Sequence, residues 1–308
     1  MATPNTPATG QAIAALTVGG TTGLYSIELS TGAAALIGTV GTETLPVQGF
    51  ANQSAGTAVI GVDGNNTLLR SNTATPSTVV TQAIAGLAVG ERVVGIDSRP
   101  ATGQLFALTT DGAGGVRVAV LDPQTGAATP LTTGFQQFTD AVGNPVPIQG
   151  TNFGLDFNPT VDRIRVVTDA GLNFRINPLT GLLVDGDAAT AGIQGDGAIN
   201  AGTTKVDATA YTNSFAGMTV TTQHTLDSTT DRLFIQNPSN NGTQSAGLDV
   251  TLNGVALDFS AVNGFDIPAA VRVATSNAPA VGQGVAALTV GGSTNLYNID
   301  LLEFGLIL

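Results

Sequence analysis

Short segments that alternate apolar and polar residues run along the chain, and turns rich in Gly, Pro, Asn and Asp separate them. Alternation with a period of two predicts strands, because successive side chains of a strand point to opposite faces. The fullest unit spans residues 91–134 and contains a first strand ending in Gly95-Ile96-Asp97, strands at 104–109 and 116–121, and a last strand after the turn at 122–126. This unit predicts a four-stranded antiparallel meander.

Comparable units recur along the chain. They begin near residues 49, 95, 154, 210 and 264, which gives spacings of 46, 59, 56 and 54 residues. Repeats of this length match the blades of a β-propeller, in which four-stranded sheets surround a channel. A solenoid would have shorter repeats, and a β-sandwich would not explain an opening motif that recurs. The pattern therefore predicts an all-β fold, a β-propeller of five or six four-stranded blades.

The two ends of the chain spell nearly the same pair of strands. Residues 14–20 and 286–292 both read AALTVGG, and LYSIEL at 24–29 answers LYNIDL at 296–301. We therefore divide the chain into an N-terminal strand segment, residues 1–45, which duplicates the closing strands, and a propeller domain, residues 46–308.

The supply of strands indicates what this N-terminal segment does. Six segments resemble the third strand of a blade and five resemble an opening strand, so one set of outer strands is surplus to a five-bladed ring. Two strands alone are marginally stable, and their edges invite pairing. The surplus hairpin either closes its own ring as a sixth, atypical blade or pairs with another chain by strand addition.

We expect the second outcome. A contact with two different sides repeats without closing, so strand addition between copies predicts a homopolymer, a fibre built head to tail. The positions expected to carry this assembly are apolar or aromatic residues of the two copies, namely Ala14, Leu16, Val18, Leu24, Tyr25, Ile27, Leu36, Leu288, Leu296, Tyr297 and Ile299.

Four segments also resemble a known family. They read GERVVGIDSRPATGQLFAL at 90–108, TNFGLDFNPTVDRIRVVTDAGLNFRINPLTG at 151–181, AYTNSFAG at 210–217 and DSTTDRLFIQNPSNNGT at 227–243. The sequence resembles the bacterial domain-of-unknown-function family numbered 4394 over residues 58–301, and the segment 11–40 is an addition to its usual pattern. The resemblance implies a propeller-like fold and a place outside the cell or on the surface of a bacterium, and it implies no activity.

Composition narrows the possible partners. The formal net charge of −12 comes from 18 Asp and four Glu against nine Arg and one Lys, so the chain repels nucleic acid. It contains no cysteine, which excludes disulfides and thiolate chemistry. No apolar run has the length of a membrane span, and the N-terminus lacks the basic and apolar regions of a secretory signal.

Aspartate in turns suggests calcium, because this ion prefers oxygen ligands. The Gly-apolar-Asp openings place Asp97, Asp156 and Asp266 at the same point of three units, where they can gather at one channel mouth. Ala51 and Thr212 occupy that point in two other units, so a complete carboxylate ring is excluded. The alternative is that each Asp caps a turn or accepts backbone N–H bonds between blades.

A second group of acidic residues, Asp185, Asp187 and Asp196, lies in a Gly-rich loop of EF-hand length. The glycine that an EF-hand requires at its sixth position is replaced by Thr190, so this loop is either an irregular calcium site or a solvated loop.

Candidates for catalysis are few. His224 is the only histidine, and it lies in an alternating strand without a nucleophile-elbow motif in the chain, so a structural role is expected. Asp162-Arg163 and Asp231-Arg232 occupy matching places in two units and are expected to tie adjacent blades. Anion binding by Arg163, Arg165 and Arg175 is the alternative.

These observations favour an extracellular structural protein without enzymatic activity that assembles with copies of itself. The alternative is a monomeric propeller that works at its channel mouth, either as an enzyme or as a module that binds carbohydrate or another ligand. The thin supply of Glu, His and aromatic residues weighs against this alternative.

Overall fold

The computed structural model describes residues 11–18, 21–39, 58–302 and 306–307. The chain divides into two compact units, Met1–Thr57 and Ala58–Leu308. Strands dominate both units, and among the described residues no helix is long and apolar enough to cross a membrane.

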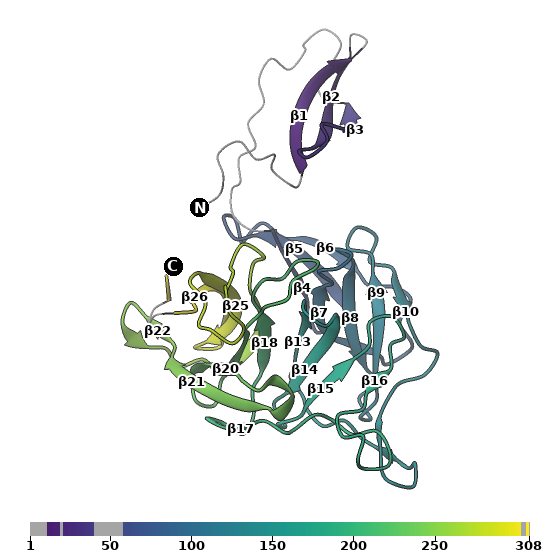
Figure 1. Cartoon of the computed structure of the whole chain (residues 1–308), viewed down its shortest axis with the longest axis vertical. Coiled ribbons are helices and arrows are strands. Elements are labelled where there is room, and N and C mark those ends of the chain that lie inside the picture. The colour runs from purple at the N-terminus through teal and green to yellow at the C-terminus, as the bar shows by residue number, and fades with distance from the viewer. Residues whose placement is uncertain (1–10, 19–20, 40–57, 303–305, 308) are drawn as a thin grey trace. The chain divides into compact units, whose positions relative to one another are not determined.

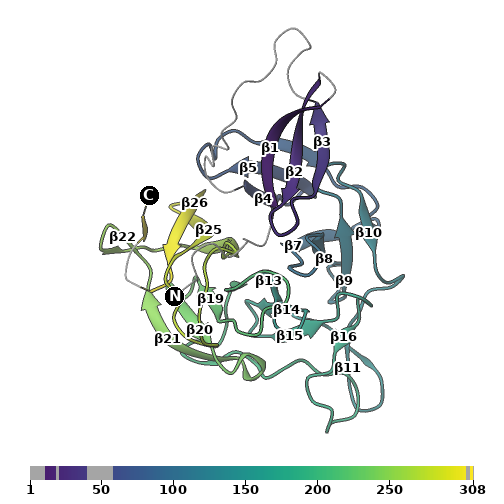
Figure 2. The same cartoon turned by 45° about the horizontal axis from the view of Figure 1, so that its top comes forward.

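The larger unit is a five-bladed β-propeller, whose sheets follow one another in chain order (Figures 1 and 2). Blade 1 contains β4 (Ala58–Val62), β5 (Thr67–Asn72) and β6 (Val80–Ala83), and blade 2 contains β7 (Arg92–Ser98), β8 (Leu105–Thr110), β9 (Val116–Leu121) and β10 (Ala128–Pro130). Blade 3 contains β13 (Phe153–Asn158), β14 (Arg163–Thr168), β15 (Asn173–Ile176) and β16 (Leu183–Val184). A small hairpin of β11 (Phe138–Thr139) and β12 (Pro145–Val146) lies between blades 2 and 3 in the chain.

The last two blades are larger. Blade 4 contains β18 (Ala208–Tyr211), β19 (Gln223–Asp227), β20 (Arg232–Gln236) and β21 (Thr243–Asp249), and β17 (Asn200–Ala201) extends it. Blade 5 contains β24 (Ala261–Asp266), β25 (Gln283–Val290), β26 (Ser293–Asp300) and β27 (Leu306–Ile307), and β22 (Thr251–Leu252) and β23 (Val255–Ala256) extend it. A single turn of 3₁₀ helix, Ser239–Asn241, joins β20 to β21.

The propeller prediction is therefore confirmed, with five blades, and so is the meander predicted from residues 91–134, which is blade 2. The first strands of blades 2 to 5 are innermost, because β7, β13, β18 and β24 contact one another in succession. The Gly-apolar-Asp motifs lie on three of these strands, as predicted.

Blade 1 differs, because its described strands are the three outer ones. Asn66 follows β4, as Asp231 follows β19. Asn66 accepts the N–H of Val93 at the start of β7, and Asp231 accepts that of Phe259 just before β24. This correspondence makes β4 the second strand of its blade. The opening predicted at Gly49-Phe50, with Ala51 at the Asp position, lies outside the described residues.

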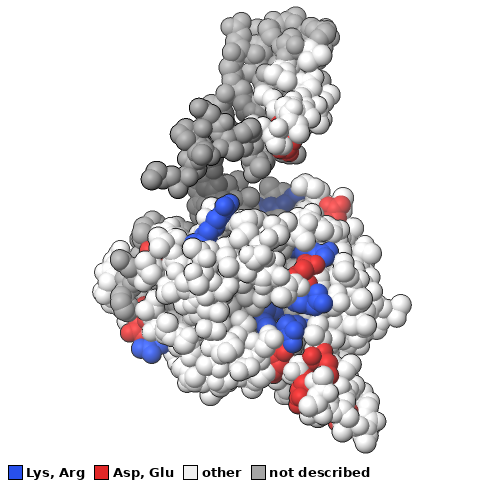
Figure 3. Space-filling view, viewed as in Figure 1, with Lys and Arg blue, Asp and Glu red and all other residues white. Residues whose placement is uncertain are grey.

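Apolar side chains fill the spaces between blades. All six residues of β8 are buried, and Phe106 meets Phe157 of blade 3 edge to face with ring centroids 5.2 Å apart. Charged side chains are sparse on the propeller face shown in Figure 3.

The smaller unit contains β1 (Gln11–Val18), β2 (Thr21–Glu28) and β3 (Ala34–Thr39), in the order β1-β2-β3. Its register repeats that of blade 5. Gln11 pairs with Glu28 and Val18 with Thr21, and 272 residues later Gln283 pairs with Asp300 and Val290 with Ser293. The outer pairing also corresponds, since β3 and β27 start at the same place on their neighbours. The duplication is therefore present in the structure as well as in the sequence.

Candidate functional site

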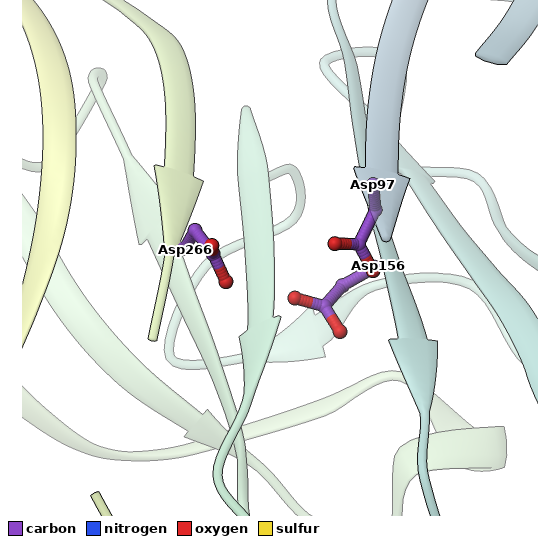
Figure 4. Close-up of side chains that lie close together, drawn as sticks. All are labelled: Asp97, Asp156 and Asp266. Atoms are coloured by element: carbon purple, nitrogen blue, oxygen red, sulfur yellow. The ribbon is translucent and has the colours of Figure 1, made fainter. Parts of the chain in front are cut away.

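Three aspartates from separate blades meet near the centre of the propeller. Asp97, Asp156 and Asp266 lie on β7, β13 and β24, and each offers a carboxylate oxygen within 4.8 Å of the others (Figure 4). Equivalent positions on innermost strands lie at the same level around the channel, which is why residues so far apart in the chain converge. The convergence expected from the repeated motif is thus observed.

Backbone N–H groups hold these carboxylates in place. The Oδ2 atom of Asp97 accepts a hydrogen bond from the N–H of Phe157 in blade 3 at 2.8 Å, and its Oδ1 atom accepts one from Ser98 at 2.6 Å. The backbone N–H of Tyr211 in blade 4 acts to lower the pKa of Asp156, and that of Ile267 acts to lower the pKa of Asp266. Bonding between blades, the alternative to a calcium role, is therefore observed at Asp97.

Burial disfavours the ionised form of each of these three carboxylates. None of the ion pairs among the described residues includes these three aspartates. Burial raises the pKa of Asp97 well above its usual value, and the charge of Asp266 raises it further. Burial, and then the charges of Asp97 and Asp266, likewise raise the pKa of Asp156. Burial also raises the pKa of Asp266.

Exposure differs within the group. Asp156 is 2% exposed, Asp97 is half-buried and Asp266 is exposed. The exposure of Asp97 and Asp266 does not remove the effect of burial on their pKa values. Their carboxyl groups face one another, and the blades around them displace bulk water. The Oδ1 atom of Asp156 is buried and has no hydrogen-bond partner.

The fourth blade contributes no carboxylate. Thr212 follows β18 and is fully buried, and its hydroxyl oxygen accepts the N–H of Thr222 at 2.9 Å. Within the described residues the carboxylate group thus has three members, as the interrupted motif predicted.

The second acidic group is not brought together. The carboxylate of Asp185 accepts the N–H groups of Asp187 and Gln194, and Asp187 accepts the hydroxyl of Thr190 within its own turn. Asp196 instead binds two arginines, with its Oδ2 atom 2.6 Å from Nη1 of Arg165 and its Oδ1 atom 2.7 Å from Nη2 of Arg175. Asp196 is therefore a structural anchor, and both arginines are occupied.

Asp162 and Asp231 tie adjacent blades, but their partners are not the arginines next to them in the sequence. Asp162 forms an ion pair with Arg99 of blade 2, and Asp231 accepts the N–H of Phe259 before blade 5. Arg163 bonds to the carbonyl of Asp162, and Arg232 pairs with Asp249 inside blade 4. Arg99 lies in the turn after Asp97, and only its two-residue distance from a motif residue could have drawn attention to it.

His224 is 1% exposed, and neither ring nitrogen has a hydrogen-bond partner. It lies opposite Ala210 and Ile235 on the central strand β19, and burial lowers its pKa to about 4. A neutral imidazole enclosed in a sheet cannot reach a substrate, so the expected structural role agrees with its position.

The predicted assembly residues fall into two sets with different surroundings. In blade 5, Leu288 is 0% and Ile299 is 2% exposed, Leu296 is half-buried, and Tyr297 packs against the same core. In the N-terminal unit, Ala14, Leu16, Tyr25 and Ile27 are half-buried and Val18 and Leu36 are exposed, whereas for Leu24 only the backbone is described.

A family model of a domain of unknown function, DUF4394, matches residues 67–305. The chain belongs to this family. The match begins within blade 1, so the N-terminal β1-β2-β3 sheet lies outside the part that DUF4394 proteins share. No curated protein matches the chain.

The solved structures that match the chain are distant. Glutaminyl cyclase from Myxococcus xanthus is 12% identical at a TM-score of 0.38, over 77% of this chain and 83% of that one. A protein of unknown function from Bacteroides thetaiotaomicron VPI-5482 is 10% identical at a TM-score of 0.44, over 95% of this chain and 67% of that one. At these levels the DUF4394 chain takes no function from either protein.

Proposed function

We propose that this DUF4394 protein is a non-enzymatic structural building block outside the cell or on the surface of a bacterium. Copies join head to tail into a fibre, because the β1-β2-β3 sheet of one copy pairs with a strand of the next. The observation that carries the proposal is the edge of β1, which among the described residues lacks the neighbour that its duplicate β25 has in β24.

The comparison with blade 5 defines the edge that is open. The carbonyl of Thr289 on β25 accepts a hydrogen bond from Ser260, just before β24, at 2.9 Å. Thr17 is the counterpart of Thr289 in the N-terminal copy, and alternate residues of a strand direct their backbone groups to the same side. The backbone groups of Ile13, Ala15 and Thr17 therefore face the edge of β1 that has no partner strand among the described residues.

Side chains of the N-terminal sheet support the same conclusion. Leu16 and Ile27 are half-buried where their counterparts Leu288 and Ile299 are enclosed, and Val18 is 60% exposed. Apolar surface and an unpaired strand edge on the same small sheet favour pairing with another chain. Because donor and acceptor surfaces differ, the contact is heterologous and repeats along a fibre.

One difference between the copies restricts the partner strand. Gly284 lies under β24, where an added Cβ would come within 2.7 Å of the Phe265 ring. The corresponding residue of β1 is Ala12, which already carries a Cβ. We therefore expect the strand that pairs with β1 to present a smaller side chain than Phe265 at this place.

Two variants test the proposal by light scattering and electron microscopy. Deleting residues 1–40 should leave soluble, folded monomers and abolish filaments. Ala15→Pro should do the same with the full chain present, because proline removes an N–H that faces the open edge and is tolerated there. Ala15→Val keeps that N–H and is the matched control, which should still assemble.

Either of two results would overturn the proposal. An intact protein that is monomeric at high concentration does not form a fibre. A deletion that unfolds the propeller would identify the N-terminal sheet as part of its own ring.

A further inference from the structure

The carboxyl groups of Asp97, Asp156 and Asp266 cluster at the channel, and the proposed strand pairing between copies does not use them. We propose that these three residues bind one hard divalent cation, with calcium the best match, and that this ion joins blades 2, 3 and 5 at the channel.

The geometry suits calcium. Carboxylate oxygens that lie within 4.8 Å of one another leave a central position close to the Ca–O bond length of about 2.3–2.6 Å. Magnesium requires shorter bonds of about 2.0–2.1 Å in a near-ideal octahedron, and three side chains fixed on separate strands cannot adjust to it as readily. Three carboxylates leave several coordination positions for water.

Asp156 supplies an observation that does not depend on the clustering itself. Its Oδ1 atom is buried without a hydrogen-bond partner, although buried carboxylate oxygens are almost always bonded. The side chain is 2% exposed and points toward the other two carboxylates (Figure 4). An ion between the three residues would satisfy this oxygen and remove the repulsion among them.

The backbone hydrogen bonds are compatible with a bound ion. The N–H groups of Ser98 and Phe157 fix the orientation of the Asp97 carboxylate, as hydrogen bonds around a ligand group commonly do. Asp266 is exposed, so the ion and its water ligands can enter from that side. A bound ion would link strands of three blades that the chain itself joins only through long segments.

Calorimetric titration of the full chain with CaCl₂, after removal of metal by chelator, tests the site. We expect one ion per chain with a Kd of about 10⁻⁴–10⁻³ M, as in other extracellular calcium modules. In 5 mM CaCl₂ the melting temperature should rise by about 2–5 °C over its value in chelator.

The variant Asp156→Asn should abolish both effects. It should melt at the same temperature as the wild type in chelator, or higher, because it removes one of the repelling charges; this result separates lost binding from lost folding. Asp187→Asn is the matched control in the other acidic loop and should bind as the wild type does. The assignment fails if the wild type does not bind calcium, if Asp156→Asn still binds, or if Asp187→Asn removes binding.

A titration with MgCl₂ decides the identity of the ion. Tighter binding of magnesium than of calcium would overturn the preference for calcium. The calcium and magnesium titrations do not depend on whether the protein forms fibres. The deletion of residues 1–40 leaves all three aspartates in place, so the variant without the N-terminal sheet can be titrated in the same way.

Discussion

The hairpins β1–β2 and β25–β26 have nearly the same sequence and the same register, yet their surroundings differ. β25 has β24 on its open side, and its hairpin packs against the core that blades 4 and 5 share. For β1 no such strand exists among the described residues, where Ala14 and Leu16 are half-buried and Val18 is exposed. The local sequence therefore determines the hairpin, whereas burial requires a neighbouring strand and a packed layer.

The largest effect should come from truncating the same leucine in the two copies. Leu288→Ala removes a fully buried side chain and should lower the free energy of unfolding of the propeller by about 2–5 kcal/mol. Leu16→Ala should change it by less than about 0.5 kcal/mol, because Leu16 belongs to the other compact unit. Urea denaturation followed by far-UV circular dichroism measures both. Equal losses would mean that the N-terminal sheet is part of the propeller core.

Acid should weaken the core beneath the C-terminal hairpin through His224. His224 lies beside Ala210 and Leu226 of that core, and its pKa falls from 6.5 to about 4 on folding. Below pH 6.5 His224 binds a proton in the unfolded chain but stays neutral in the folded one. The free energy of unfolding therefore falls as the pH decreases toward 4. The wild type should lose up to about 3 kcal/mol relative to His224→Leu between pH 7 and pH 4.

Urea denaturation of both proteins across this pH range measures that difference. The leucine variant should be about as stable as the wild type at pH 7, because the imidazole has no hydrogen bond to lose. A difference in stability that stays constant with pH would show that folding does not lower the pKa of His224.

A smaller effect should distinguish the copies at Gly284 and its counterpart Ala12. Gly284→Ala places a methyl group against the buried ring of Phe265 and should destabilise the propeller by about 1–3 kcal/mol. The reverse change in the other copy, Ala12→Gly, should leave the stability of the propeller unchanged. Thermal melts of the two variants give the comparison, and an unaffected Gly284→Ala would show that Phe265 can move aside.

The same division between local and tertiary information runs through the carboxylate site. The repeat of Gly-apolar-Asp predicted which strands are innermost and that Asp97, Asp156 and Asp266 share a level, because repeated units adopt repeated positions. The sequence also marked Thr212 as an interruption. It could not show that Asp156 retains an unbonded oxygen, since that depends on which backbone N–H groups of blade 4 come within reach.

Alternation and turn residues determined by themselves that this chain is all-β, that its units are blades, and that its ends carry the same hairpin, because these features depend on neighbours within a few residues. Only the tertiary structure decided that five blades form, that Asp196 binds Arg165 and Arg175 rather than lining an ion site with Asp185 and Asp187, and that Asp162 pairs with Arg99. Those outcomes depend on contacts between residues that are distant in the chain. Their distance in space decides which residues pair, and the spacing of the sequence does not reveal it.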